Sequence, residues 1–301
     1  MRSLLITGSN GLLGGKLVLA ASRAYKVFGL DVHPESLIRH DRLEYSQGDI
    51  TDRDRVLRQL EAVEPDAVIH TAAYTDVDGC ELHFEKAYAV NVTGAEHVAA
   101  ACKRLGIGMV HLSTDYVFDG MDGPYREEDP PKPLSAYGRM KLDSERLVLS
   151  LLPDAVVVRT MVLFGHLPHV RRNFVTWLKY KLENGERIRV VNDQYGTPTF
   201  ADDLAKALLA VFEKGLRGLY HAAGSEWLDR HAFALQVADV FGLDGSLISE
   251  TTSDQFKQPA PRPMKSGLKT DKLERDTGFR FKPLVDALLE LKSQMATAAR
   301  T

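Results

Sequence analysis

Residues 3–14 read SLLITGSNGLLG, an apolar run that passes directly into a glycine-rich turn. Ser3–Thr7 is typical of a buried strand, and Leu12–Ala21 has the length and apolar content of a helix. The turn between them spaces its glycines as GxxGxxG. A chain with 23 glycines produces that spacing by accident, but here it follows the first strand and opens the first helix. Glycines allow a close backbone approach and the helix N-terminus favours anions, so the segment predicts a site for a dinucleotide pyrophosphate.

Short apolar runs alternate with helical patterns through the first half of the chain. Further strands are expected at Lys26–Leu30, near Arg42–Tyr45, and at Ala67–Thr71, Gly108–Ser113 and Ala155–Arg159, with helices at about Asp52–Ala62, within Phe84–Leu105 and around Ala136–Leu151. Apolar runs of this length between helices indicate parallel strands joined by crossovers. The pattern predicts an α/β fold with a Rossmann-type doubly wound parallel sheet, whose ligands bind at the carboxyl ends of the strands.

The pattern loosens after about Thr160. Helices are expected near Asn173–Asn184, Ala201–Glu213, Arg230–Phe241 and Leu284–Met295, separated by polar and proline-containing segments. We predict a dinucleotide-binding domain over residues 1–160 and a smaller, interleaved substrate-binding lobe over residues 161–301. The β-like run Gly218–His221 suggests that part of residues 200–222 returns to the main sheet.

Composition narrows the class of protein. The 301 residues are 44% hydrophobic and 26% charged, with a formal net charge of -3. This charge gives no excess of cations to hold a nucleic acid or an anionic membrane, and no apolar run approaches the ~18 residues of a membrane span. The two cysteines, Cys80 and Cys102, have no metal-like spacing and fit a reducing compartment. His166 and His169 are separated by Pro168, so we expect no metal and a cytoplasmic location.

Asp31 ends the second apolar run, where a carboxylate can accept hydrogen bonds from the adenine ribose of a dinucleotide. Its charge would repel a 2′-phosphate, which favours NADH over NADPH. Arg39 and His33 lie close enough to Asp31 in sequence to reduce this repulsion of a 2′-phosphate. Either cofactor, NADH or NADPH, is therefore expected, with NADH preferred.

Tyr137 and Lys141 form a YxxxK pattern. The spacing alone says little, because a chain of this composition produces it by chance. A helix beginning at about Ser135 would, however, place both side chains on one face. A strand ending at Ser113-Thr114-Asp115 delivers Thr114 to the same edge of the sheet. Lys141 and a positively charged nicotinamide would lower the pKa of the phenol toward the working range, and Thr114 would hydrogen-bond the substrate oxygen.

Residues 113–120 read STDYVFDG, and this block resembles the dTDP-4-dehydrorhamnose reductase family of extended short-chain dehydrogenases. Matching segments occur in the family's order at residues 73–78, 89–91, 159–160, 173–174, 193–199 and 262–263. The resemblance implies reduction of the 4-keto group of a nucleotide-activated deoxysugar, with dTDP-4-dehydro-L-rhamnose giving dTDP-L-rhamnose. It assigns catalysis to Thr114, Tyr137 and Lys141. Taken with the glycine-rich turn, it places the cofactor against Gly8, Asn10, Gly11, Leu12, Leu13, Gly14, Asp31, Asp49, Ile50, Thr71, Ala72, Ala73, Tyr137 and Lys141. The substrate is expected to contact Thr114, Asp115, Tyr116, Val162, Asn173 and Arg262.

The chain departs from the family pattern at three places. Met161-Val162 replaces a frequent Ser-Trp, so an aromatic wall beside the sugar is expected to be missing. Ser144 precedes Glu145 where the family favours glycine, and residues 166–172 are unusually basic.

Two alternatives stay open from the sequence. One is a non-catalytic, dinucleotide-binding regulatory subunit. The other is a nucleotide-sugar epimerase or dehydratase, although Asp115 is followed by Tyr116 and half of a dehydratase's acid pair is absent. A homodimer is also left open as a hypothesis.

Overall fold

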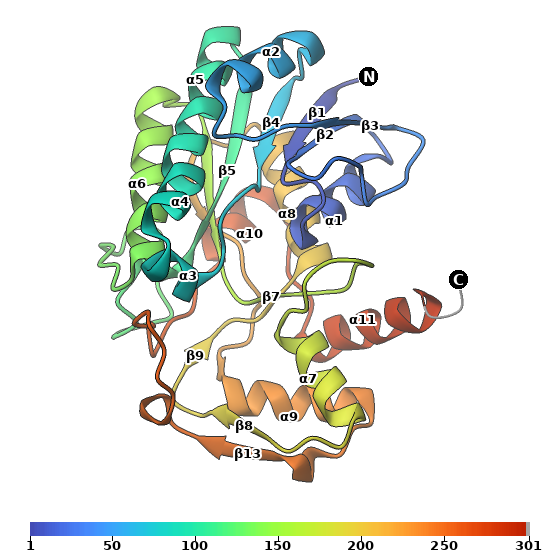
Figure 1. Ribbon diagram of the computed structural model, residues 1–301, viewed down its shortest axis with the longest axis vertical. Coiled ribbons are helices and arrows are strands. Elements are labelled where there is room, and N and C mark those ends of the chain that lie inside the picture. The colour runs from blue at the N-terminus through green and yellow to red at the C-terminus, as the bar shows by residue number, and fades with distance from the viewer. Residues whose placement is uncertain (299–301) are drawn as a thin grey trace.

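Seven parallel strands form the centre of the computed structural model, which describes residues 1–298 (Figure 1). Their order across the sheet is β11 (Gly218–His221), β6 (Val156–Thr160), β5 (Gly108–Thr114), β4 (Ala67–His70), β1 (Ser3–Thr7), β2 (Lys26–Asp31) and β3 (Leu43–Gln47). The expected doubly wound parallel sheet is confirmed. The order reverses between β1 and β4, and such a reversal opens a ligand crevice at the carboxyl ends of the strands.

Helices cover both faces of the sheet because each central strand is apolar on both sides. In β1, Leu4 and Ile6 pack toward α1 (Leu12–Ala21) and α8 (Ala201–Glu213), whereas Leu5 packs toward the opposite face. That second face is covered by α2 (Arg53–Val63), α5 (Ala95–Leu105) and α6 (Ala136–Leu151), and the short α10 (Asp271–Thr277) lies on the α8 side (Figure 1).

The second lobe has its own core beneath the carboxyl edge of the sheet. Its helices are α7 (Phe174–Glu183), α9 (Arg230–Phe241) and α11 (Leu284–Ala298). Three small sheets pair β7 (Leu163–Phe164) with β10 (Thr199–Phe200), β8 (Ile188–Val191) with β13 (Ile248–Thr251), and β9 (Tyr195–Gly196) with β12 (Leu228–Asp229). Single 3₁₀ turns follow at Gly245–Leu247 and Ser253–Gln255. Phe164, Leu178 and Phe233 are fully buried at the centre of this lobe.

The helix expected within Phe84–Leu105 is interrupted. After α3 (Val77–Leu82), the chain forms α4 (Phe84–Tyr88), a π-helical segment η1 (Ala89–Gly94) and then α5. The π segment carries the buried Asn91, whose amide accepts from the Tyr74 N–H (2.8 Å) and donates to the Tyr74 carbonyl (3.0 Å). The π-helical turn, which has one residue more than an α-helical turn, therefore places Asn91 where its side chain holds the loop after β4.

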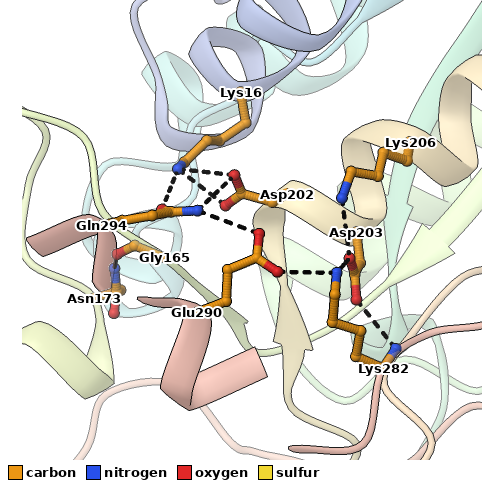
Figure 2. A network of polar contacts seen from close by, with 9 residues as sticks. All are labelled: Lys16, Gly165, Asn173, Asp202, Asp203, Lys206, Lys282, Glu290 and Gln294. Carbon is orange, nitrogen blue, oxygen red and sulfur yellow. Dashed lines mark hydrogen bonds and ion pairs between the residues drawn. The ribbon is translucent and has the colours of Figure 1, made fainter. Parts of the chain in front are cut away.

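A polar network links α1 and α8 to α11 and to the segment that precedes it (Figure 2). The buried Lys16 of α1 donates to Asp202 of α8 (3.0 Å) and to Gln294 of α11 (2.8 Å). Next to it, Lys282 contacts Asp203 and lies 3.2 Å from Glu290. These contacts fasten the C-terminal helix α11 to α1, the helix that follows the glycine-rich turn.

Among residues 1–298, no helix has both the length and the apolar composition that crossing a membrane requires.

Candidate active site

A cavity of about 910 Å³ runs along the carboxyl ends of the central strands. It brings together most of the residues expected from the sequence: Gly8, Gly11, Leu12, Leu13, Gly14, Asp31, Asp49, Ile50, Thr71, Ala72, Ala73, Thr114, Asp115, Tyr116, Tyr137, Lys141 and Val162. Segments far apart in the chain meet here because parallel strands place all their carboxyl ends at one edge. Tyr74 and Ser113, which lie within the family-like segments 73–78 and 113–120, also line the cavity, as does Lys86, which no motif in the sequence had singled out.

The glycine-rich turn is closed too tightly for other residues. Gly8 adopts φ +68°, and a Cβ there would lie 2.8 Å from the backbone of Ala72. A Cβ on Gly14 would lie 2.1 Å from the Gly8 carbonyl oxygen. The tight turn places the first turn of α1, which contains no acidic residue, at the wall of the cavity. Unpaired amides at that end suit a pyrophosphate.

Asp31 lies at the end of β2, with one oxygen accepting from the Asn10 N–H (3.0 Å) and the other from the His33 N–H (3.2 Å). Each carboxylate oxygen keeps a free lone pair, so Asp31 can still accept from ribose hydroxyls. With the apolar Ile50, Ala72 and Val90 also in the wall, the cavity offers an anion site, a ribose acceptor and a flat apolar surface. These are the groups that a dinucleotide needs, and the site fits one.

Thr114 and Tyr137 both line the cavity, and Thr114 is close enough to act on the pKa of the Tyr137 phenol. Thr114 is the N-cap of the 3₁₀ turn Asp115–Val117, and it accepts from the Tyr116 N–H at 3.2 Å. Ser135 caps α6 in the same way by accepting from Gly138 (3.1 Å), which sets Tyr137 in the first helical turn. The two capped turns hold the pair at the edge of the sheet.

Burial raises the pKa of the Tyr137 phenol well above its ordinary value, and the neighbouring Thr114 side chain opposes that rise. The expectation that this pKa is lowered is wrong for this structure, because burial of the phenol outweighs the other influences on it. Tyr137 therefore stays protonated at neutral pH. A neutral phenol is the form that can donate a proton.

Lys141 follows Tyr137 by one helical turn and is almost completely buried. Burial lowers the pKa of its amine to about 8, and the charge of Glu145 opposes that fall. A proton-exchanging group with a pKa near neutrality is useful in general acid–base chemistry.

Asp115 is also buried, and burial raises its pKa to about 6. It accepts from Thr114 (3.1 Å) and from Ser266 (2.7 Å). Ser266 lies 151 positions away in sequence, so no local pattern could have assigned it to the site. Burial raises the pKa of the neighbouring Tyr116 as well, while Arg230 and Arg262 lower it. Both guanidinium groups are thus close enough to act on this end of the cavity.

Three expected site residues do not line the cavity. Asn10 donates to the Glu35 carbonyl (3.0 Å) and holds the loop after β2. Asn173 caps α7 and donates to the Gly165 carbonyl (2.6 Å). Arg262 makes a two-pronged ion pair with Asp78 of α3, at 3.0 and 2.8 Å.

Val162 has φ +44°, a conformation that β-branched residues strongly disfavour. Its carbonyl accepts from the Thr199 N–H (3.1 Å), which ties it to the second lobe. Strained backbone of this kind collects at functional sites and costs about 1–3 kcal/mol. This strained residue, Val162, is the one expected from the sequence to stand where the family often has an aromatic side chain beside the sugar.

Comparison with known proteins gives one consistent result. Residues 1–296 match the family model described as RmlD substrate binding domain. A dTDP-4-dehydrorhamnose reductase from Mycobacterium tuberculosis is 40% identical over 88% of this chain and 84% of its own length. A solved structure of a dTDP-4-dehydrorhamnose reductase from Clostridium acetobutylicum is 31% identical and superposes with a TM-score of 0.87 over 98% of this chain and 100% of that one. Another, from Bacillus anthracis in complex with NADP, is 29% identical with the same score and the same coverage.

Proposed function

The chain belongs to the dTDP-4-dehydrorhamnose reductase family, and on that premise we propose that it reduces the 4-keto group of dTDP-4-dehydro-L-rhamnose to give dTDP-L-rhamnose. One observation carries the proposal: Thr114 and Tyr137 lie together in the wall of a cavity suited to a dinucleotide, with Lys141 one helical turn further on.

NADH or NADPH is the proposed cofactor, since a family relative has been solved with NADP. Gly8 and the turn Gly11–Gly14 would hold the pyrophosphate, Asp31 the adenine ribose, and Asp49, Ile50 and Thr71–Ala73 the remaining wall. When bound, the reduced nicotinamide supplies the hydride that the carbonyl carbon accepts.

The protein's own residues handle the carbonyl oxygen. Thr114 would hydrogen-bond that oxygen and orient it toward Tyr137. Tyr137, kept protonated by burial, would donate its proton as negative charge develops on the oxygen. Lys141, whose pKa is about 8, can return a proton to the phenolate at neutral pH. Arg262 would contact the nucleotide diphosphate after exchanging Asp78 for phosphate oxygens.

A panel of nucleotide-activated 4-keto sugars, each assayed with NADH and NADPH, tests this function. We expect one reduced dinucleotide to be consumed for each alcohol formed, with the 4-hydroxy product identified by NMR. Turnover without net cofactor consumption would point instead to an epimerase or dehydratase. Dinucleotide binding with no turnover of any sugar would point to a regulatory subunit.

Val162 sets the breadth of the sugar pocket in this proposal. Without an aromatic face the enzyme is expected to accept several 4-keto-6-deoxysugars, and Val162→Trp should narrow the range toward the rhamnose precursor by restoring a contact of about 1–3 kcal/mol. Competition kinetics with two keto sugars measures this. If the wild type already discriminates sharply and Val162→Trp only impairs it, another residue supplies the wall.

Asp31 sets the cofactor preference. Asp31→Ala is expected to shift kcat/KM toward NADPH by about tenfold or more, because it removes a negative charge beside the 2′ position. Asp41→Ala, which changes an exposed carboxylate on the same connection between β2 and β3, is the control and should leave the ratio unchanged. A wild type that strongly prefers NADPH would show that Asp31 does not contact the ribose.

The proposal also covers the roles of the two lobes, the cellular location and the assembly. Residues 1–160 are proposed to bind the dinucleotide and residues 161–301 the sugar nucleotide, with part of residues 200–222 counted with the main sheet, where β11 lies. A cytoplasmic location is supported by the two free, buried cysteines. A homodimer is the proposed assembly, to be checked by light scattering.

A further inference from the structure

Two polar side chains lie behind Lys141, away from the cavity. His111 of β5 and Ser144 of α6 are fully buried, and neither lines the cavity. The His111 Nε2 atom lies 2.9 Å from the Ser144 Oγ and 3.5 Å from the Lys141 Nζ. Ser144 is one of the positions where the chain departs from the family pattern, which favours glycine there.

Counting protons fixes the tautomer of His111. A serine hydroxyl has one proton, and Ser144 donates it to the Lys141 carbonyl at 2.8 Å. The 2.9 Å contact with His111 must then run from the ring Nε2–H to the Ser144 oxygen. Burial keeps the pKa of His111 well below its ordinary value, so the ring is neutral and carries this one proton.

The other ring nitrogen leads to the same tautomer. His111 Nδ1 is buried and has no hydrogen-bond partner among residues 1–298. An N–H donor left unpaired in a protein interior is rarer and costlier than an unpaired acceptor. Nδ1 is therefore the unprotonated nitrogen. Two independent counts place the proton on Nε2, the nitrogen nearer to Lys141.

This proton matters because of the groups that face Lys141. The negative charge of Glu145, one turn further along α6, favours the ammonium form. His111 and the stacked His70, whose rings are 5.3 Å apart, are both held neutral. Tyr137 is neutral as well, and Arg159 is occupied with Glu145. The His111 Nε2–H, directed at the Ser144 oxygen, thus places its partial positive charge beside an amine that, within residues 1–298, has no carboxylate within hydrogen-bond distance.

We propose that Ser144 and His111 act as a positioning pair. The Ser144 oxygen accepts from the His111 Nε2–H and keeps its partial positive charge beside the Lys141 amine. This charge lowers the affinity of the amine for its proton. The inference rests on the proposed function for the catalytic role of Lys141, but the state of the pair does not depend on it. Ser144 then tunes the lysine toward proton exchange at neutral pH, which a glycine at this position could not do.

The test is Ser144→Ala, with Ser150→Ala as the control because Ser150 is an exposed serine on the same helix. In ¹⁵N-histidine-labelled enzyme, the wild type and the control should show a neutral His111 protonated on Nε2. In Ser144→Ala the ring is free to turn its lone pair toward Lys141, so the Nε2-protonated form should decline. The pH dependence of Lys141 labelling by acetic anhydride, read by mass spectrometry, should then move up by about 0.5–1 pH unit.

Both measurements need no substrate, so they fail or succeed independently of the reductase assay. A wild-type ring protonated on Nδ1 would overturn the proposal. So would a Ser144→Ala enzyme that is folded by circular dichroism yet labels Lys141 with the wild-type pH dependence. If Ser144→Ala does not fold, Ser144→Gly, the residue that the family favours, provides the same comparison.

Discussion

Tyr137→Phe is expected to lose about 10²–10⁴-fold in kcat, the usual worth of a general acid. The substitution removes one hydroxyl and leaves the ring that packs edge-on against Tyr116, 5.6 Å away. Because burial keeps the phenol protonated, its loss removes a proton donor that is ready in the resting enzyme. Dinucleotide affinity should stay within about threefold, since the pyrophosphate and ribose are held at the other end of the cavity.

Tyr88→Phe is the matched control, because it removes the same hydroxyl from an exposed tyrosine on α4. Steady-state kinetics and cofactor titration by fluorescence measure both variants. A Tyr137→Phe enzyme that retains more than about a third of wild-type kcat would remove the phenol from the mechanism. A joint loss of turnover and dinucleotide binding would show instead that the ring supports the cofactor site.

The main sheet could be predicted from the sequence because its strands are buried on both faces. Continuous apolar runs such as Ala67–His70 have no other stable setting between helices, and their ends fell within a residue or two of those expected. The small sheets of the second lobe could not be predicted. A strand such as β9, two residues long, is too short to show a period and exists only through its partner.

The residues of the candidate site also divide into those that could be predicted from the sequence and those that could not. Asp31 and Thr114 end their strands and Gly8 directly follows one, so parallel topology alone brings them together. Ser266 and Arg230 reach the site through the packing of the second lobe, and no sequence signal marks them. His111 was hidden for another reason: inside the run Gly108–Thr114 it reads as a strand residue, and its meaning depends on Ser144 of a different element.

The direction of the Tyr137 pKa was wrong because sequence spacing does not report burial. An i,i+4 lysine suggested a nearby positive charge. In the structure the phenol is buried, and desolvation has the largest effect on its pKa.

Glu145→Gln is expected to lower the free energy of unfolding by about 3–5 kcal/mol, the largest stability change predicted for this chain. Glu145 and Arg159 are 4% and 3% exposed and form a two-pronged ion pair at 2.9 and 2.7 Å. Ser113 donates to the same carboxylate. A neutral amide leaves the Arg159 charge buried without a counter-charge, and a third guanidinium nitrogen, Nη1, already has no partner. Urea denaturation monitored by circular dichroism gives the change in midpoint.

Two further variants separate the effect of the uncompensated buried charge on stability from the other effects of the Glu145→Gln substitution. Glu183→Gln breaks an exposed ion pair on α7 with Lys179 and should cost less than about 0.5 kcal/mol. The double variant Glu145→Gln with Arg159→Met removes both charges and should recover most of the lost stability, since apolar replacements for buried pairs are often neutral. If the double variant is as unstable as Glu145→Gln alone, the damage comes from lost hydrogen bonds and packing around Ser113 and Phe118. An uncompensated guanidinium would then not be the cause.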